Sequence, residues 1–141
     1  MERAAEIVLD ASVVVKWFSE EEDSDIALKV RSEHIDGLTT LVSPDLMLYE
    51  VVNALRYNPG FNSDDVKRAA SDLIDLEMDL ITPSNELFEN AAKHAYRYDL
   101  TIYDACYLSL AEHMGLEALT ADERLYEKTR ESGLIKLLKD Y

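Results

Sequence analysis

The sequence is poor in the residues that stabilise small secreted or zinc-binding domains. One cysteine among 141 residues cannot form an internal disulfide, and no Cys/His cluster with the spacing of a zinc site is present. Proline and glycine are scarce, with three and four copies. No linker or internal repeat is visible, and the acidic stretch at residues 20–25 is the one biased tract. The sequence therefore reads as one continuous folded unit.

Long hydrophobic runs are also lacking near the start of the chain. The first six residues carry two acids, and the next apolar run, residues 7–9, ends at Asp10. This is neither a signal peptide nor a membrane span. We therefore expect a cytoplasmic protein with no membrane association.

Basic residues are few relative to acidic ones. The chain has 14 Lys and Arg against 29 Asp and Glu, which gives a formal net charge of −15. By itself this charge favours cations, basic proteins or metal ions as partners and argues against a polyanion such as nucleic acid. The hydrophobic fraction of 48% and the length indicate one folded domain, residues 1–141.

Short apolar runs alternate with helical patterns along the whole chain. This alternation predicts an α/β fold with a mostly parallel central sheet of about five strands and helices on both faces. The expected strands are residues 7–9, 41–42, 80–82, 118–120 and 134–138. The expected helices are residues 13–18, 23–36, 45–56, 63–76, 85–98, 102–113 and 122–131.

Two acids directly follow expected strands. Asp10 ends the run at residues 7–9, and Asp122 follows the run at residues 118–120. Open α/β sheets bind their ligands at the carboxyl ends of strands, at a point where the strand order switches. The alternative role for either residue is to cap the helix that follows it.

Two further acids lie on helix faces that are otherwise apolar. Glu50 shares a helical stripe with Met47, Val51 and Ala54, where an unpaired charge is unfavourable. Asp104 lies in the first turn of the helix at residues 102–113, on the side expected to face the sheet. A buried ion pair for Glu50 and helix-dipole complementation for Asp104 are the alternatives.

The four acids converge if the first and fourth strands are neighbours. Carboxylates packed together raise one another's pKa, so such a cluster needs a cation. Oxygen ligands suit Mg²⁺ or Mn²⁺. The sequence therefore predicts a divalent metal site.

The segments that hold these acids form an ordered set over nearly the whole chain. They are residues 8–18, 50–55 and 100–111, the last leading into residues 119–125. In order and spacing they resemble the PIN-domain ribonucleases, most closely the small VapC-type toxins of toxin–antitoxin pairs. The resemblance implies a metal-dependent endoribonuclease, and the family's acidic quartet maps onto Asp10, Glu50, Asp104 and Asp122.

The resemblance also implies supporting residues and partners. Thr120 occupies the hydroxyl position beside the last acid, and Ser12 and Asn53 match polar positions near the site. The expected partners are an RNA substrate, a VapB-like antitoxin protein that blocks the site, and a second copy of the chain in a homodimer. Lys16 and Arg124 are candidates for phosphate contact, with a solvated surface role as the alternative.

Metal binding changes how the net charge is interpreted. Two divalent ions at the quartet would take the formal charge from −15 to −11. The remaining charge still opposes long-range attraction of RNA. We therefore expect weak RNA affinity that depends on the bound metal, and tight affinity for an inhibitor that bears arginine.

Two other classes of protein place similar residues at similar points. Asp-based phosphotransfer proteins, of the receiver or haloacid-dehalogenase type, also have an aspartate after the first strand. The dehalogenase pattern requires a second aspartate two positions later, where this chain has Ser12. A non-catalytic module that binds another protein through its acidic pit is the other alternative.

Overall fold

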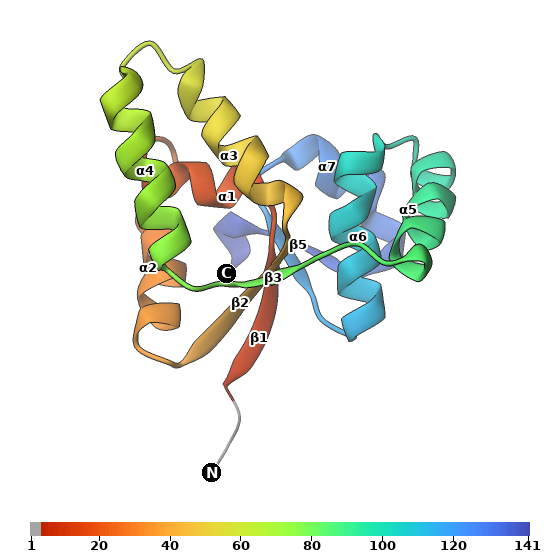
Figure 1. Ribbon diagram of the computed structural model, residues 1–141. Coiled ribbons are helices and arrows are strands. Elements are labelled where there is room, and N and C mark those ends of the chain that lie inside the picture. Colours follow the sequence, from red (N-terminus) through yellow and green to blue (C-terminus); the bar gives the residue numbers. More distant parts are fainter. Residues whose placement is uncertain (1–3) are drawn as a thin grey trace.

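The computed structural model describes residues 4–141 and contains a five-stranded sheet with the order β3-β2-β1-β4-β5 (Figure 1). Every ladder is parallel, which confirms the predicted α/β class. The strands are β1 (Ala5–Leu9), β2 (Thr39–Pro44), β3 (Asp79–Ile81), β4 (Ala118–Thr120) and β5 (Ile135–Leu137).

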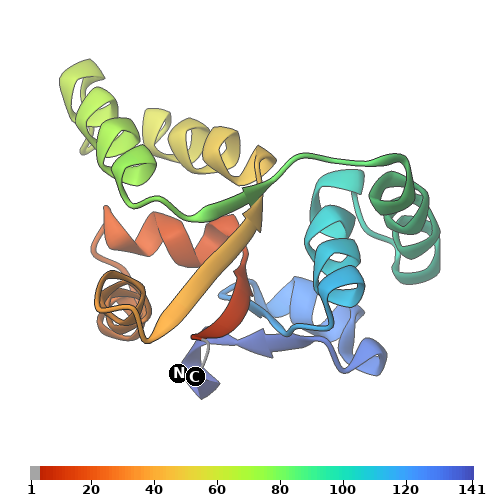
Figure 2. The same ribbon diagram turned by 60° about the horizontal axis from the view of Figure 1, so that its bottom comes forward.

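Helices cover both faces of the sheet, as expected from the crossover connections. Helices α1 and α2 pack against one face, α6 packs against the other, and α5 lies on the outer side of α6 (Figure 2). No helix within residues 4–141 is long and apolar enough to cross a bilayer. The α-helices are α1 (Ala11–Val14), α2 (Ser24–Ile35), α3 (Leu46–Arg56), α4 (Ser63–Asp75), α5 (Asn85–Tyr98), α6 (Ile102–Met114) and α7 (Glu123–Lys128). Three short 3-10 helices are η1 (Val15–Trp17), η2 (Arg130–Ser132) and η3 (Leu138–Asp140).

The central strands are buried on both faces because their sequences are continuous apolar runs. Val8 and Leu9 of β1, Leu41 and Val42 of β2, and Leu119 of β4 are all 0% exposed. These side chains form the centre of the core and hold the carboxyl ends of β1 and β4 side by side.

The strand order places a switch point next to β1. Val8 is in register with Val42 of β2 on one side and with Ala118 of β4 on the other. The chain builds outward from β1 through β2 to β3, then crosses back to place β4 on the opposite side of β1. The loops that follow β1 and β4 therefore flank the crevice where ligands of such sheets bind.

Side-chain caps begin several helices where the sequence offers a short polar residue. Asn62 and Asp65 form a reciprocal capping box at α4, and Ser84 accepts a hydrogen bond from the Leu87 N–H at α5. Helix α6 ends at Gly115, whose φ of 67° lies in the left-handed region that suits glycine. That ending agrees with the sequence prediction.

One expected helix is divided, and another helix and the last strand are shorter than predicted. The helix expected at residues 13–18 divides into α1 and η1, in a segment with three consecutive β-branched valines. The helix expected at residues 122–131 ends as α7 at Lys128, since the Thr129 hydroxyl donates to the Leu125 carbonyl at 2.8 Å. The last strand gives way to η3 at Leu138, which turns its side chain into the core at 1% exposure.

Candidate functional site

Asp10 lies at the switch point, immediately after β1, and is only 7% exposed. It stands at the N-cap position of α1, but its side chain makes no capping hydrogen bond. Instead, the hydroxyls of Ser12 and Thr120 both donate to Oδ2, at 2.6 and 2.8 Å. The alternative of a helix cap is therefore wrong for Asp10, and two side chains fix the orientation of its carboxylate.

Thr120 connects Asp10 to Asp122. The hydroxyl of Thr120 donates to Asp10 and accepts the backbone N–H of Asp122 at 3.0 Å. Asp122 also caps α7, because its Oδ1 accepts the backbone N–H groups of Arg124 and Leu125 at 2.9 and 3.2 Å. The capping alternative thus holds for Asp122, and it fixes this carboxylate beside the end of β4.

Glu50 projects from α3 toward α6. Its neighbours on the helix stripe, Met47 and Val51, are 0% exposed, while Glu50 itself is half-buried. The hydroxyl of Tyr107, a fully buried residue of α6, donates to Glu50 Oε1 at 2.5 Å. This bond across two helices replaces the buried ion pair that was the alternative for Glu50.

Asp104 lies in the first turn of α6 and is partly buried. Its backbone N–H donates to the hydroxyl of Thr101, the N-cap residue, at 3.1 Å. The cap fixes the start of α6, and with it the Asp104 side chain, next to the ends of β1 and β4.

The four acids, which we call the carboxylate cluster, repel one another. Burial raises the pKa of Asp10, and the charge of Asp122 raises it further against the opposing effect of the Ser12 and Thr120 hydroxyls. Burial likewise raises the pKa of Glu50 and of Asp104, and the charge of Asp10 adds to both. These shifts mean that the ionised cluster is unfavourable without a compensating cation.

Basic side chains do not neutralise the cluster directly. None of the salt bridges found within residues 4–141 includes any of the four acids. The nearest electrostatic relief comes from Lys128, whose charge lowers the pKa of Asp104 but does not outweigh burial and the two neighbouring carboxylates.

The donor chemistry of the cluster fits a hard divalent cation. Its side chains offer only oxygen atoms, the ligands that Mg²⁺ and Mn²⁺ prefer. In the described part of the chain, no three acidic, histidine or cysteine side chains are arranged closely enough to enclose a metal ion. Mg²⁺ is usually held through one or two carboxylates and keeps several waters, so a closed shell of protein ligands is not required.

The remaining predicted residues lie at varying distances from this network. Asn53 is exposed on α3, one turn beyond Glu50, and takes part in none of the side-chain hydrogen bonds seen for residues 4–141. Lys16 donates to the Glu22 carbonyl at 2.7 Å and pairs with Glu21, so its ammonium is already engaged. Arg124 is exposed on α7 near the cluster.

Two residues beside the cluster are not evident from the sequence. Tyr107 fits the apolar pattern of α6, so sequence reasoning treats it as a core or stacking residue. The available signal is that Tyr107 lies three positions after Asp104, on the same stripe, where a hydroxyl can reach a carboxylate. Lys128 is one charge among many on α7 and carries no sequence signal.

Comparisons with known proteins show the family to which the chain is related. A family model described as the PIN domain matches residues 7–131. Among curated proteins, Ribonuclease VapC3 of Pyrobaculum aerophilum is 32% identical over 126 residues, which cover 86% of this chain and 93% of that protein.

Solved structures share the fold. A toxin–antitoxin complex from Klebsiella pneumoniae contains a chain that superposes with a TM-score of 0.68 at 16% identity, over 94% of this chain and 97% of that one. A member of the VapBC family of toxin–antitoxin systems from Mycobacterium tuberculosis, VapBC-5, gives a TM-score of 0.60 at 14% identity, over 94% and 97%. At these identities the likeness is one of fold.

Proposed function

The chain belongs to the PIN-domain family, and from this premise we propose that it is a divalent-metal-dependent endoribonuclease of the VapC type. The observation that carries the proposal is the convergence of four carboxylates at the switch point of the sheet without a salt bridge to any of them within residues 4–141. The relationship to Ribonuclease VapC3 supports RNA as the substrate.

The cluster divides into groups with different roles. Asp10 and Asp104 are proposed to hold the metal directly, and Glu50 and Asp122 to hold a second ion or to act through water. A bound Mg²⁺ or Mn²⁺ would lower the pKa of a coordinated water and stabilise the negative charge that develops on the phosphate oxygens.

The side chains around the ion orient its ligands and move a proton. Ser12 and Thr120 hold Asp10 in one orientation through its Oδ2 atom. Tyr107 holds Glu50, whose raised pKa suits it to accept the proton of an attacking water. Asn53, on the same side of α3 as Glu50, is proposed to contact the substrate.

The proposal extends to partners. We propose a VapB-like antitoxin as the inhibitor, because an acidic pit without a paired cation accepts an arginine side chain. A homodimer and a cytoplasmic location are further parts of the proposal. Light scattering of the purified chain tests the dimer.

The decisive experiment is RNA cleavage by the purified chain, freed of any partner. A panel of tRNA, rRNA and mRNA is incubated with Mg²⁺ or Mn²⁺, with EDTA, and with the variants Asp10→Asn and Asp104→Asn. We expect metal-dependent cleavage by the native chain and none in EDTA or by either variant, while circular dichroism shows folding unchanged. Absence of cleavage across the whole panel would refute the proposed ribonuclease function.

A further inference from the structure

A hollow opens from one side of the carboxylate cluster between α6 and α7. It has a volume of about 390 Å³. We call it the α6–α7 hollow, and it is lined by Asp99, Leu100, Thr101, Asp104, Asp122, Arg124, Leu125 and Lys128. Because two of the four cluster acids belong to its wall, a chain bound at the cluster can continue directly into it.

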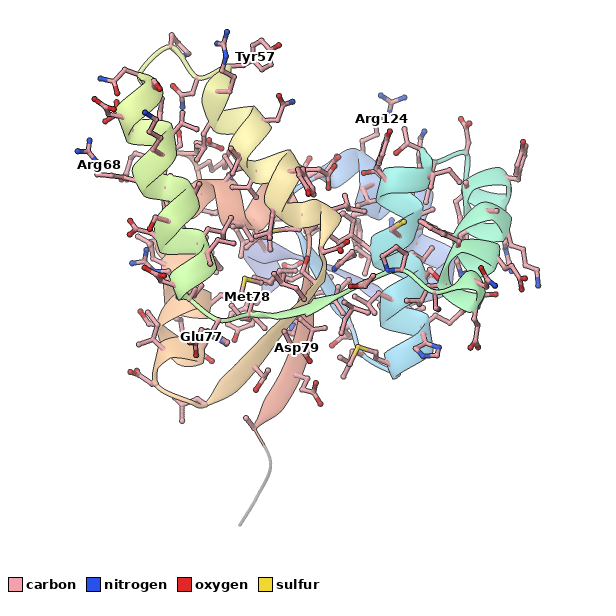
Figure 3. All side chains as sticks on the ribbon, in the orientation of Figure 1. Tyr57, Arg68, Glu77, Met78, Asp79 and Arg124 are labelled. Atoms are coloured by element: carbon pink, nitrogen blue, oxygen red, sulfur yellow. The ribbon has the colours of Figure 1, made fainter. Side chains whose placement is uncertain are left out.

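Two cations stand on the α7 side of this hollow. Arg124 and Lys128 are four positions apart, so they lie on the same side of the helix. Lys128 Nζ donates to the Asp99 carbonyl at 2.7 Å and also pairs with the Asp99 carboxylate at 3.6 Å, which ties α7 to the turn before α6. Arg124 is exposed, forms no salt bridge within residues 4–141, and projects beyond the ribbon near α6 and α7 (Figure 3).

Other hollows of the molecule suit a phosphodiester chain less well. The hollow between the start of α3 and helices α5 and α6 is lined by apolar side chains such as Phe88 and Leu110 and has no cation in its wall. The hollow on the other side of Ala121 has Lys16 and Lys139, but these pair with Glu21 and Glu123. Within residues 4–141, neither hollow offers a cation that lacks a carboxylate partner, whereas Arg124 of the α6–α7 hollow forms no salt bridge.

Metal binding changes the sign of the charge in the α6–α7 hollow. Its two cations and three carboxylates give a formal charge of −1, and the divalent ion proposed to bind Asp104, at the wall of the hollow, would make it +1. The same surface therefore repels a phosphate before the ion binds and attracts one afterwards. Arginine presents a planar fork that matches phosphate oxygens in pairs, so Arg124 is the stronger of the two contacts.

We propose that the α6–α7 hollow binds the RNA phosphate next to the one that is cut, with Arg124 as the direct contact and Lys128 in support. This inference rests on the proposed ribonuclease function and adds the side on which the RNA strand leaves the site. The bound metal would then have two effects. It would raise RNA affinity by changing the charge of the hollow, and it would separately assist cleavage.

The test measures RNA binding and metal binding separately. Fluorescence anisotropy follows a short, mixed-sequence, labelled single-stranded RNA with Ca²⁺ or with EDTA, over a range of salt concentrations. In Ca²⁺, Arg124→Ala is expected to weaken binding about tenfold and to reduce the slope of log K against log salt by about 0.7. Arg124→Lys keeps the charge but loses the fork, so it should recover part of the loss.

A matched variant separates a local contact from net charge. Lys139→Ala makes the same change in charge on the other side of Ala121, and it should leave the RNA affinity and the salt slope unchanged. Calorimetric Mn²⁺ affinity should be the same in the native chain, Arg124→Ala and Lys139→Ala. Lys128→Met, checked by thermal denaturation, should give a smaller loss of RNA affinity than Arg124→Ala.

The outcomes distinguish this inference from the proposed function. If the native chain cuts RNA but Arg124→Ala binds it with unchanged affinity and slope, the inference is wrong and the function stands. Equal losses in Arg124→Ala and Lys139→Ala would also refute it, since the effect would then be one of net charge. If the native chain neither binds nor cuts RNA with metal present, both fail.

Discussion

The hydroxyl groups of Ser12, Thr120 and Tyr107 orient two of the four cluster carboxylates, those of Asp10 and Glu50. Two of these hydroxyls donate to one oxygen of Asp10, and the third donates to Glu50 from a ring that is 0% exposed. Ser12 lies two residues after its acid, whereas Thr120 and Tyr107 reach their acids from β4 and α6. Substitution of such a hydroxyl is expected to affect the site more than the fold.

Tyr107→Phe tests this expectation at Glu50. The phenyl ring still fills the core, but Glu50 loses the hydroxyl that fixes it at 2.5 Å. We expect calorimetric Mn²⁺ affinity and the rate of RNA cleavage each to fall about tenfold, the size typical of a lost hydrogen bond to a charged group.

Tyr141→Phe is the matched control for that variant. The Tyr141 hydroxyl also donates to a glutamate, Glu33, at 2.9 Å, but this pair lies outside the carboxylate cluster. The control should therefore bind Mn²⁺ and cut RNA like the native chain. Equal Mn²⁺ affinity for Tyr107→Phe and the native chain would show that Tyr107 does not position Glu50.

Helix α6 contributes two members of the site, and its start is set by one cap. Thr101 accepts the backbone N–H of Asp104, so the cap and the acid belong to the same turn. A shift in the first turn of α6 moves Asp104 relative to Asp10 and Asp122. The cap is therefore expected to matter for activity as well as for stability.

Thr101→Ala should lower the free energy of unfolding in urea by about 1 kcal/mol, the usual effect of losing a helix cap. It should also reduce RNA cleavage more than Ser84→Ala does, although Ser84 caps α5 in the same way by accepting the Leu87 N–H at 3.2 Å. Helix α5 carries no cluster acid, which makes Ser84→Ala the matched control. Equal activity of the two variants would contradict this role for the α6 cap.

The elements and the acids were predictable to different degrees. Periodicity, caps and glycine stops located every strand and most helices, although β1 and β2 extend beyond the residues expected for them. The convergence of the four acids was expected on the condition that the first and fourth strands are neighbours, and the sheet order meets that condition. The end of α7 and the last strand were overestimated, because Thr129 and Leu138 make contacts that depend on the folded neighbourhood. Tyr107 was missed for the same reason, since its partner is 57 residues away along the chain.

Folding also separates Lys16 from Arg124, the two basic residues that the sequence offered as candidates for phosphate contact. A lysine near the first acid suggests a phosphate contact, but folding brings it onto the Glu22 carbonyl. Arg124 has the same sequence signal and stays unpaired by any acid of residues 4–141. The fold of the surrounding loops determines which basic side chain is available to contact a phosphate, and the composition of the sequence does not show this.

The raised pKa values of three cluster acids make the free energy of unfolding of the whole molecule depend on pH. The folded chain holds protons on Asp10, Glu50 and Asp104 to higher pH than the unfolded chain, whose carboxyls titrate near pH 4. Above about pH 4 the native state therefore binds more protons than the unfolded state. The free energy of unfolding consequently falls as the pH rises through the raised pKa values.

Asp10→Asn tests this relation between the site and stability. In EDTA the native chain should melt at a higher temperature at pH 5 than at pH 7, and the variant should show a smaller difference. At pH 7 the variant should melt no lower than the native chain, because Asn Oδ1 still accepts hydrogen bonds from Ser12 and Thr120 without the buried charge.

Bound metal should make the native chain more stable than Asp10→Asn at pH 7. Saturating Mn²⁺, at about one hundred times its Kd, stabilises a protein by about 2.7 kcal/mol, and this gain should appear in the native chain and not in Asp10→Asn. Differential scanning calorimetry with and without Mn²⁺ gives both results. A variant that melts below the native chain in EDTA at pH 7 would show that Asp10 is structural.

The outermost strands of the sheet, β3 and β5, are three residues long, as is the inner strand β4, while the inner strands β1 and β2 have five and six residues. Short outer strands present few unpaired backbone groups to another molecule. The two edges of the sheet therefore offer little template for intermolecular strand pairing. We expect the purified chain to stay dispersed at high concentration without forming fibrils.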